Sequence, residues 1–162
     1  MQTKPQPGLA GIILLIVGVV IAVILITQNG AAQKPPAQGD GFTDPQMLLI
    51  PRWFLSALTV NGQKLEIAPG QQTTTLQFTP DGKANGKGGC NNFSTTYQAG
   101  PDGKMSFSPV ISTKMACPDT MAQESAYFEG LAKTQQFKIE AGQLILSSAD
   151  GQTRLVFSRP PK

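Results

Sequence analysis

The apolar positions of this chain follow two patterns, a single unbroken run near the start and short periods after it. From Gly8 to Thr27 the chain runs for twenty residues without a charged side chain. A helix of that length is about 30 Å long, which matches the hydrocarbon core of a bilayer. The pattern therefore predicts a transmembrane helix over residues 8–28, with the lipid bilayer as its surroundings.

Polar segments flank this run. Residues 1–7 form a short lead that we expect in the cytoplasm, and residues 29–46 form a Pro- and Gly-rich tether too poor in apolar groups to fold alone. A cleaved signal peptide is the alternative, because Gly30-Ala31-Ala32 offers small residues to a peptidase. The apolar core of such a peptide usually spans about 7–15 residues, so the longer run here favours an uncleaved signal anchor.

A period of two residues dominates from residue 47 onward. Trp53, Leu55, Ala57 and Thr59 alternate with Phe54, Ser56 and Leu58, which predicts a half-buried strand, and Asn61-Gly62 then predicts a hairpin turn. Further strands are predicted within 73–79, 92–98, 105–111 and 136–159. The apolar group Met47–Ile50 is expected to pack on this domain, with the membrane surface as the alternative contact.

One segment after Cys117 changes to a helical period. A helix is predicted from Pro118 to about Thr134, with early negative charge near its positive end. Its predicted core face carries Met121, Ser125, Phe128 and Ala132, with Leu131 alongside. The expected fold class is therefore a β-rich α+β domain over residues 47–160, a small antiparallel barrel-like structure whose one helix covers the open side of a curved sheet.

Composition narrows the chemistry. The chain has no histidine, so a Ser-His-Asp or Cys-His arrangement cannot be built. Its net charge of +3 comes from scattered cations without interleaved aromatic residues, which disfavours a nucleic-acid partner. Acids are available at Glu66, Asp119, Glu124 and Glu129, but no spacing places two of them together. We expect no enzyme activity, no cofactor and no metal site.

Three groups of residues carry a family resemblance. They are Gly89-Cys90-Asn91-Asn92-Phe93 with Tyr97, Thr113-Lys114-Met115-Ala116-Cys117 with Glu124, and Trp53-x-Leu55. Together they make residues 51–159 resemble the META domain, the HslJ-like family of bacterial envelope proteins. This family is a fold without settled chemistry, so the resemblance implies an architecture, and for the motif residues structural roles, but no activity. A link to envelope stress or drug tolerance is an association of the family.

Cys90 and Cys117 are the only cysteines of the chain. A structural disulfide and a redox-active pair are the two interpretations, and 26 intervening residues favour the first, since exchange chemistry prefers close spacing. A disulfide needs an oxidising compartment, which would keep the amino terminus in the cytoplasm and the domain outside it. We therefore expect a single-pass protein of the bacterial plasma membrane, or a secreted one if the signal is cleaved.

These expectations favour a binding or structural module of the envelope that contacts a protein partner. The alternative is an accessory subunit of a larger membrane complex, docked through the Gly8–Thr27 helix. Two less favoured hypotheses place chemistry in the domain: a hydrolase that uses carboxylates, and a small-molecule site inside the barrel lined by Trp53, Phe78 and Phe107. Trp53 itself is expected in the core, with stacking on a ligand as the alternative.

Overall fold

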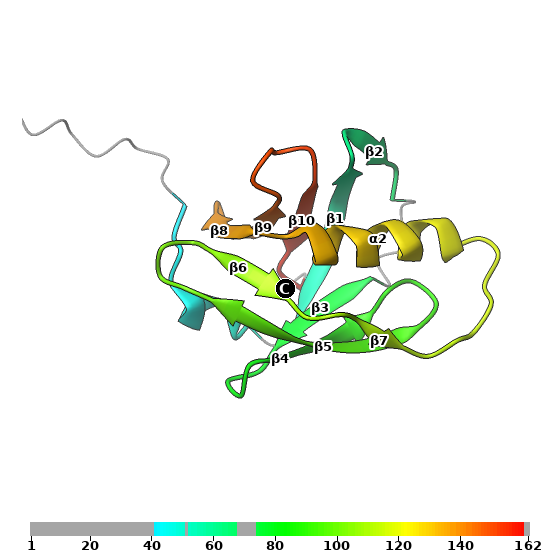
Figure 1. Ribbon diagram of the computed structural model, residues 1–162, viewed down its shortest axis with the longest axis horizontal. Coiled ribbons are helices and arrows are strands. Elements are labelled where there is room, and N and C mark those ends of the chain that lie inside the picture. Colours follow the sequence, from blue (N-terminus) through cyan, green and yellow to red (C-terminus); the bar gives the residue numbers. More distant parts are fainter. Residues whose placement is uncertain (1–40, 51, 68–73, 161–162) are drawn as a thin grey trace, which may run out of the picture. The chain divides into compact units, whose positions relative to one another are not determined.

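A computed structural model describes residues 41–50, 52–67 and 74–160, all within one compact unit, Gly39–Lys162 (Figure 1). The predicted transmembrane helix at Gly8–Thr27, the lead before it and most of the tether lie outside the described residues. Among the residues that are described, no helix has both the length and the apolar character needed to cross a membrane.

The described residues form a short 3-10 helix, ten strands and one α-helix. In chain order these are η1 (Pro45–Leu48), β1 (Trp53–Val60), β2 (Gln63–Leu65), β3 (Thr75–Phe78), β4 (Lys83–Lys87), β5 (Asn92–Ala99), β6 (Met105–Phe107), β7 (Ile111–Ser112), α2 (Met121–Lys133), β8 (Gln136–Glu140), β9 (Gln143–Ser147) and β10 (Arg154–Ser158).

All pairings described are antiparallel, and the sheet order is β6-β5-β4-β3-β1-β10-β9-β8, with β2 beside β1 and β7 beside β5. The two ends of this order meet, because the N–H of Met105 donates to the carbonyl of Gln135 at 3.0 Å and the N–H of Phe137 donates to that of Gly103 at 2.8 Å. The sheet is therefore a nearly closed barrel. Helix α2 packs on β1, β6, β9 and β10 (Figure 1). The predicted β-rich fold with one packed helix is confirmed.

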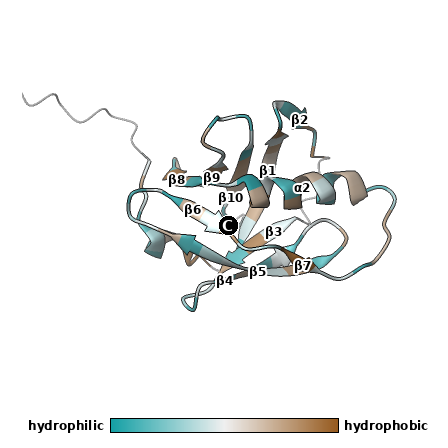
Figure 2. Ribbon diagram, viewed as in Figure 1, coloured by the Kyte–Doolittle hydropathy of each residue, from teal (hydrophilic) through white to brown (hydrophobic). Residues whose placement is uncertain are grey.

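The core lies between the helix and the inner face of the sheet. Figure 2 shows hydrophobic and hydrophilic residues interspersed along the strands, as expected for strands with one buried and one solvated face. The apolar group before β1 packs on this core as predicted, with Leu48 fully buried and Met47, Leu49 and Ile50 partly so. The packing begins before residue 47. Phe42, in the segment predicted to be a tether, exchanges two backbone hydrogen bonds at 2.8 Å with Ile139 of β8.

Strand β1 departs from its predicted pattern in its second half. Trp53 and Leu55 are buried as expected, but the register with β10 shifts between Leu55 and Ala57. Beyond this bulge the buried side chains are Leu58 and Val60, so the prediction that Ala57 and Thr59 face the core was wrong. An extra residue in one strand moves every following side chain to the opposite face of the sheet.

Helix α2 also presents a different face from the predicted one. Its buried residues are Glu124, Tyr127, Gly130 and Leu131, whereas the predicted core positions Met121, Ser125 and Ala132 are exposed. Leu131 is buried and Phe128 half-buried, so these two positions hold. The predicted core face did not include Glu124, and a charged side chain is rarely buried without a partner. In the structure Glu124 has hydrogen-bond partners in the bend before β5. The buried face of α2 therefore includes Glu124 and is rotated relative to the predicted face.

Several turns form where the residue types predicted them. The Asn61-Gly62 turn joins β1 to β2 with φ of 53° and 75°, which the left-handed region of a two-residue hairpin requires. The turn between β3 and β4 is held by Asp81, whose side chain accepts from the Thr79 hydroxyl at 2.5 Å and pairs with Lys83 at 2.6 Å. These contacts, with Lys83 first, lower the pKa of Asp81 to about 2.

Candidate functional site

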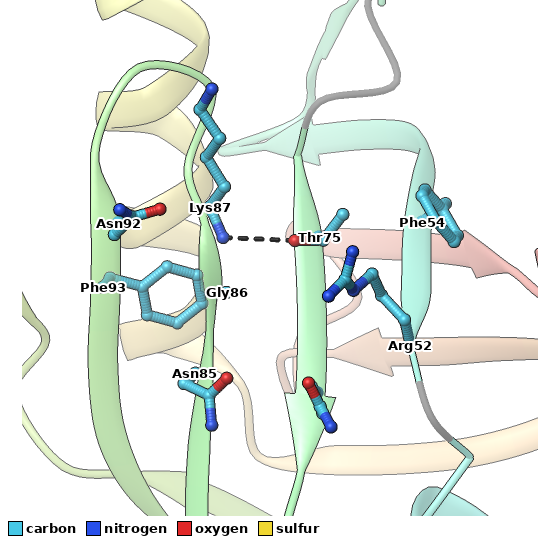
Figure 3. A pocket seen from close by; sticks show the side chains of 9 residues that line it. Arg52, Phe54, Thr75, Asn85, Gly86, Lys87, Asn92 and Phe93 are labelled. Carbon is cyan, nitrogen blue, oxygen red and sulfur yellow. Dashed lines mark hydrogen bonds between the residues drawn. The ribbon is translucent and has the colours of Figure 1, made fainter.

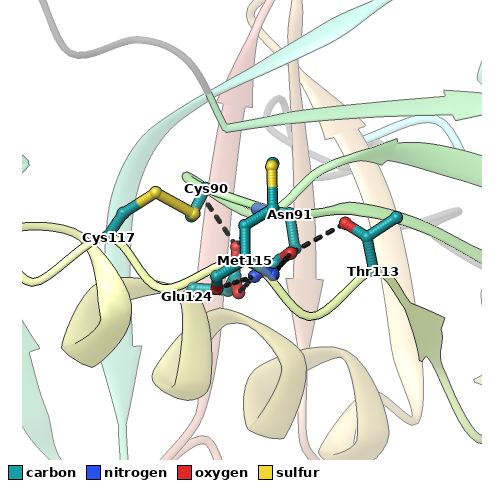
Figure 4. Close-up of a disulfide and its surroundings, with 6 residues drawn as sticks. All are labelled: Cys90, Asn91, Thr113, Met115, Cys117 and Glu124. Carbon is teal, nitrogen blue, oxygen red and sulfur yellow. Dashed lines mark hydrogen bonds between the residues drawn. A yellow bond between two sulfur atoms is a disulfide. The ribbon is translucent and has the colours of Figure 1, made fainter.

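The residues of the two cysteine-containing motifs converge beside the first turns of α2 (Figure 4). Cys90, in the bend before β5, is bonded to Cys117, in the loop before α2, with an S–S distance of 2.03 Å. Cys90 is buried, so a thiolate could reach its sulfur only after the bend opens. Cys117 is half-buried, so the structural interpretation rests on the burial of Cys90 and on the wide spacing of the two cysteines.

A buried carboxylate holds the bend on the other side of this disulfide. The side chain of Glu124 is 4 % exposed, and its Oε2 accepts the backbone N–H groups of Cys90 at 3.0 Å and Asn91 at 2.6 Å. The bend can approach the helix this closely because residue 88 is glycine: a Cβ there would lie 2.8 Å from Cγ of Glu124. The acid on the helix thus binds the two amides that would otherwise be buried without acceptors.

Asn91 connects the bend to the second motif. Its Oδ1 accepts from the Thr113 hydroxyl and from the N–H of Met115, both at 2.7 Å, while its Nδ2 donates to Oε1 of Glu124 at 2.7 Å and to the Met115 carbonyl at 3.0 Å. From their residue type, Asn91 and Asn92 are expected to bond to the backbone of their own bend. Asn91 instead fixes the segment at 113–115, and Asn92 has an exposed side chain without a hydrogen bond in the described part of the chain.

The other motif residues support packing. Phe93 is buried with its ring centroid 5.4 Å from that of Phe128. The Tyr97 hydroxyl donates to the Thr79 carbonyl at 3.2 Å. Gly89 has a φ of 138°, a region that residues with a Cβ rarely adopt. Met115 contributes its backbone, because its side chain is 52 % exposed.

Trp53 is fully buried, and its Nε1 donates to the Leu48 carbonyl at 3.0 Å. The tryptophan is therefore a core residue, as predicted, and its burial argues against stacking on a ligand. Phe78 and Phe107, which the hypothesis of a small-molecule site inside the barrel also named, pack on neighbouring rings. The ring centroid of Phe78 lies 4.8 Å from that of Tyr97 and 6.2 Å from that of Phe107.

Of the four acids named as catalytic candidates, Asp119 is exposed, and the other three have separate partners. Glu66 pairs with Lys64 at 2.9 Å and Glu129 pairs with Lys133 at 2.8 Å, while Glu124 is committed to the bend. Within residues 41–50, 52–67 and 74–160, no three His, Cys, Asp or Glu side chains form a group that could hold a metal ion. The motif cluster can thus fix a loop, but these contacts provide no paired acid and base.

A second site lies on the outward face of the sheet, with α2 behind the strands (Figure 3). It is an open cleft of about 540 Å³ that crosses β1, β3, β4 and β5. Its lining residues are Arg52, Phe54, Thr75, Gln77, Asn85, Gly86, Lys87, Asn92 and Phe93.

Strand register brings these side chains together. Thr75 lies opposite Phe54 on one side and Lys87 on the other, and Lys87 in turn lies opposite Asn92. Gln77 lies opposite Asn85 one step along the same strands. The β3 and β4 backbones run especially close at Gly86, where a Cβ would lie 2.0 Å from the Thr75 carbonyl oxygen.

The cleft carries positive charge and free amide groups. Arg52 and Lys87 line it, and none of the described residues that line it is acidic. In the described part of the chain, neither cation has an ion-pair partner, and the side chains of Gln77, Asn85 and Asn92 have no hydrogen bond. This cleft was not predicted from the sequence. Polar residues do alternate along residues 75–87, which indicates an outward face of strands. Only the pairing of the strands shows that these residues lie beside Arg52 and Phe54.

The chain is similar to a known protein family and to solved structures. The family model of the META domain matches residues 47–161. A protein from Burkholderia xenovorans solved by NMR is 28 % identical with a TM-score of 0.59, over 72 % of this chain and 86 % of that one. No curated protein matches.

Two more distant structures share the fold alone. One is a DUF4847 family protein from Bacteroides vulgatus, 14 % identical with a TM-score of 0.53 over 72 % of this chain and 97 % of its own. The other is a protein solved by NMR, 23 % identical with a TM-score of 0.53 over 70 % of this chain and 92 % of its own.

Proposed function

The chain belongs to the META domain family, and from that premise we propose that it is a non-catalytic, HslJ-like binding or structural module of the bacterial envelope. In this proposal Gly8–Thr27 anchors it in the plasma membrane and the domain lies outside the cytoplasm. The family association with envelope stress makes a stress-related role part of the same proposal.

One observation carries this proposal: the family's motif residues are used to hold the fold together. Glu124 is buried and accepts three hydrogen bonds from Cys90 and Asn91, and Asn91 in turn holds the 113–115 segment. An acid with all of these contacts satisfied is poorly placed to exchange a proton with a substrate. The motif is accordingly better suited to fold stability than to catalysis.

The disulfide supports the proposed compartment. Disulfides persist in the periplasm and outside the cell, and are rare in the reducing cytoplasm. A Cys90–Cys117 bond on the carboxyl side of the apolar run is therefore consistent with a cytoplasmic amino terminus and an external domain.

Thiol labelling in spheroplasts tests both the bond and its location. A membrane-impermeant PEG-maleimide should leave the chain unmodified, and after treatment with a membrane-impermeant phosphine reductant it should label at least Cys117, the more accessible of the two cysteines. Labels without the reductant would mean free thiols, and labels only after lysis would place the domain in the cytoplasm. Either result would contradict the proposal.

An alkaline carbonate wash of the membranes then separates an anchor from a cleaved signal. An anchored chain stays in the pellet at full mass. A shortened chain in the soluble fraction would show that the signal is removed and that the domain is released.

A second candidate is an accessory subunit of a larger membrane complex. The observation that favours it is the exposure of apolar side chains between β7 and the start of α2, where Ile111 is 74 %, Met115 52 % and Met121 37 % exposed. Replacing Gly8–Thr27 by an unrelated membrane anchor tests this role in native gels. A complex that depends on the segment would disappear, whereas unaltered assembly would defeat the docking role of the helix.

A further inference from the structure

We propose that the cleft across β1, β3, β4 and β5 binds a carboxylate-bearing saccharide. The inference rests on the proposed function as an external binding module and assigns that module a ligand class. Charge, hydrogen-bonding groups and shape each contribute to the argument.

The charge of the cleft selects an anion. Arg52 comes from the segment before β1 and Lys87 from the end of β4, and both line the same hollow without an acidic lining residue among those described. Like charges that share a surface repel each other, and a ligand with a negative group relieves this repulsion. Arginine binds a planar carboxylate through two parallel N–H groups, so Arg52 is the natural partner of such a group.

The amides select a ligand rich in hydroxyl groups. Gln77 and Asn85 lie directly opposite each other across β3 and β4, and Asn92 lies opposite Lys87 across β4 and β5. Each amide offers both a donor and an acceptor. Sugar hydroxyls also donate and accept, so they can satisfy all three side chains at once.

The shape and the aromatic residue fit a sugar ring. The cleft volume of about 540 Å³ falls within the usual range of small-molecule sites. Phe54 is half-buried beside it on β1, where its ring offers an apolar surface next to polar groups (Figure 3). An acidic peptide would also satisfy the cations, but it would leave three amide side chains without the dense set of hydroxyl partners that a sugar supplies.

The test compares two sugars that differ by one carboxylate. N-acetylmuramic acid carries a lactyl acid that N-acetylglucosamine lacks, and triglutamate serves as an acidic peptide probe. Binding is followed by NMR on the ¹⁵N-labelled full chain, in a detergent without a sugar headgroup so that the micelle does not compete. We expect N-acetylmuramic acid to shift the side-chain amides of Gln77, Asn85 and Asn92 and to bind at least tenfold more tightly than N-acetylglucosamine.

Matched substitutions locate the site. Arg52→Gln and Lys87→Gln should each weaken binding of N-acetylmuramic acid by about tenfold, the usual effect of losing one charge-assisted hydrogen bond. Arg154→Gln, on β10, and Lys104→Gln, in the turn before β6, make the same chemical changes away from the cleft and should leave the affinity unchanged. The emission of Trp53 checks that each variant remains folded.

Four results would overturn the proposal: equal affinity for both sugars, no binding of either sugar, chemical-shift changes outside the cleft, or tighter binding of triglutamate. None of these results depends on the labelling experiment described above. A membrane-anchored, disulfide-bonded chain that fails to distinguish the two sugars would lose this site and keep its assignment as an envelope module.

Discussion

Glu124 and Asn91 are joined by two hydrogen bonds, from the Asn91 N–H to Oε2 at 2.6 Å and from Asn91 Nδ2 to Oε1 at 2.7 Å. The acid comes from α2 and the amide from the bend before β5, so the pair connects the helix to the sheet. The disulfide joins the same bend to the loop that leads into α2. Together they fix the loop that carries both family motifs.

Replacing this acid tests how much the pair contributes. Glu124→Gln keeps the side-chain size but turns one acceptor oxygen into a donor that faces buried N–H groups. Leaving a buried group without its partner costs about 1–3 kcal/mol, so we expect the free energy of unfolding to fall by about 2–3 kcal/mol. Denaturant unfolding followed by emission of Trp53, the only tryptophan, measures the change.

Glu129→Gln is the matched control for that measurement. Glu129 lies on the same helix but is exposed, where water screens its pairing with Lys133, so this variant should lose little stability. Equal losses of stability in the two variants would show that the buried contacts of Glu124 contribute no more to the free energy of unfolding than the exposed contacts of Glu129.

Removal of the disulfide should lower stability by a comparable amount. The bonded residues are 27 positions apart, and in the chain-entropy account a loop of this size contributes about 3.5 kcal/mol. The double variant Cys90→Ser with Cys117→Ser should therefore unfold at lower denaturant concentration than the oxidised chain. The natural chain in the presence of reductant serves as the control and should show a similar loss. Unchanged stability in both would rule out a structural role for the bond.

Gly86 should tolerate no side chain. A Cβ at this position would lie 2.0 Å from the Thr75 carbonyl oxygen, so Gly86→Ala must push β3 and β4 apart and cost about 3 kcal/mol or more. Gly142→Ala is the comparison, because it meets no atom within 4 Å and carries only the strain of a φ of 78°, about 1 kcal/mol. Thermal unfolding distinguishes the two. A smaller loss at Gly86 than at Gly142 would contradict the close approach of these strands.

Alkaline pH should unfold the domain through Tyr127. Burial raises the pKa of Tyr127 well above 10, while the unfolded chain ionises near 10. The folded pKa is the higher one, so this contribution to stability is fully present below about pH 10 and is lost as the pH rises above it. Absorbance at 295 nm should show Tyr127 ionising together with the change in Trp53 emission that reports unfolding.

Tyr127→Phe provides the control for the alkaline transition, because it removes the ionisable group and should make stability less dependent on pH above 10. Tyr97, whose pKa is raised by burial and then by Asp81, is only partly buried and should ionise before the transition. Ionisation of both tyrosines near pH 10 in a chain with native Trp53 emission would contradict the buried position of Tyr127.

Much of the fold could be predicted from local patterns. The alternation from Phe93 to Tyr97 corresponds to β5, and Asn61-Gly62 forms its hairpin, because side-chain period and turn chemistry depend on neighbouring residues only. Two of the incorrect predictions concern contacts with residues that are distant in the sequence. The bulge in β1 depends on its pairing with β10, and the face of α2 depends on the amides that receive Glu124.

The sites divide in the same way. The motif residues could be named in advance, since they are close in sequence and carry a resemblance, but the role of Asn91 as a bridge to Met115 could not. The cleft could not be found at all from the sequence. Its lining comes from four strands, and the contact between Phe54 and Thr75 depends on a register that no local pattern encodes.

Local patterns were enough to place most strands, several turns and the helix, and to show that the two cysteines could close a loop, but the strand β4 (Lys83–Lys87) was not predicted. The buried face of β1 and of α2, the acid that holds the bend, and the polar side chains that share the cleft became clear only from the folded chain. The physical reason is that local conformation depends on adjacent residues, whereas a buried polar group or a cleft depends on partners that the chain brings together only when the sheet closes.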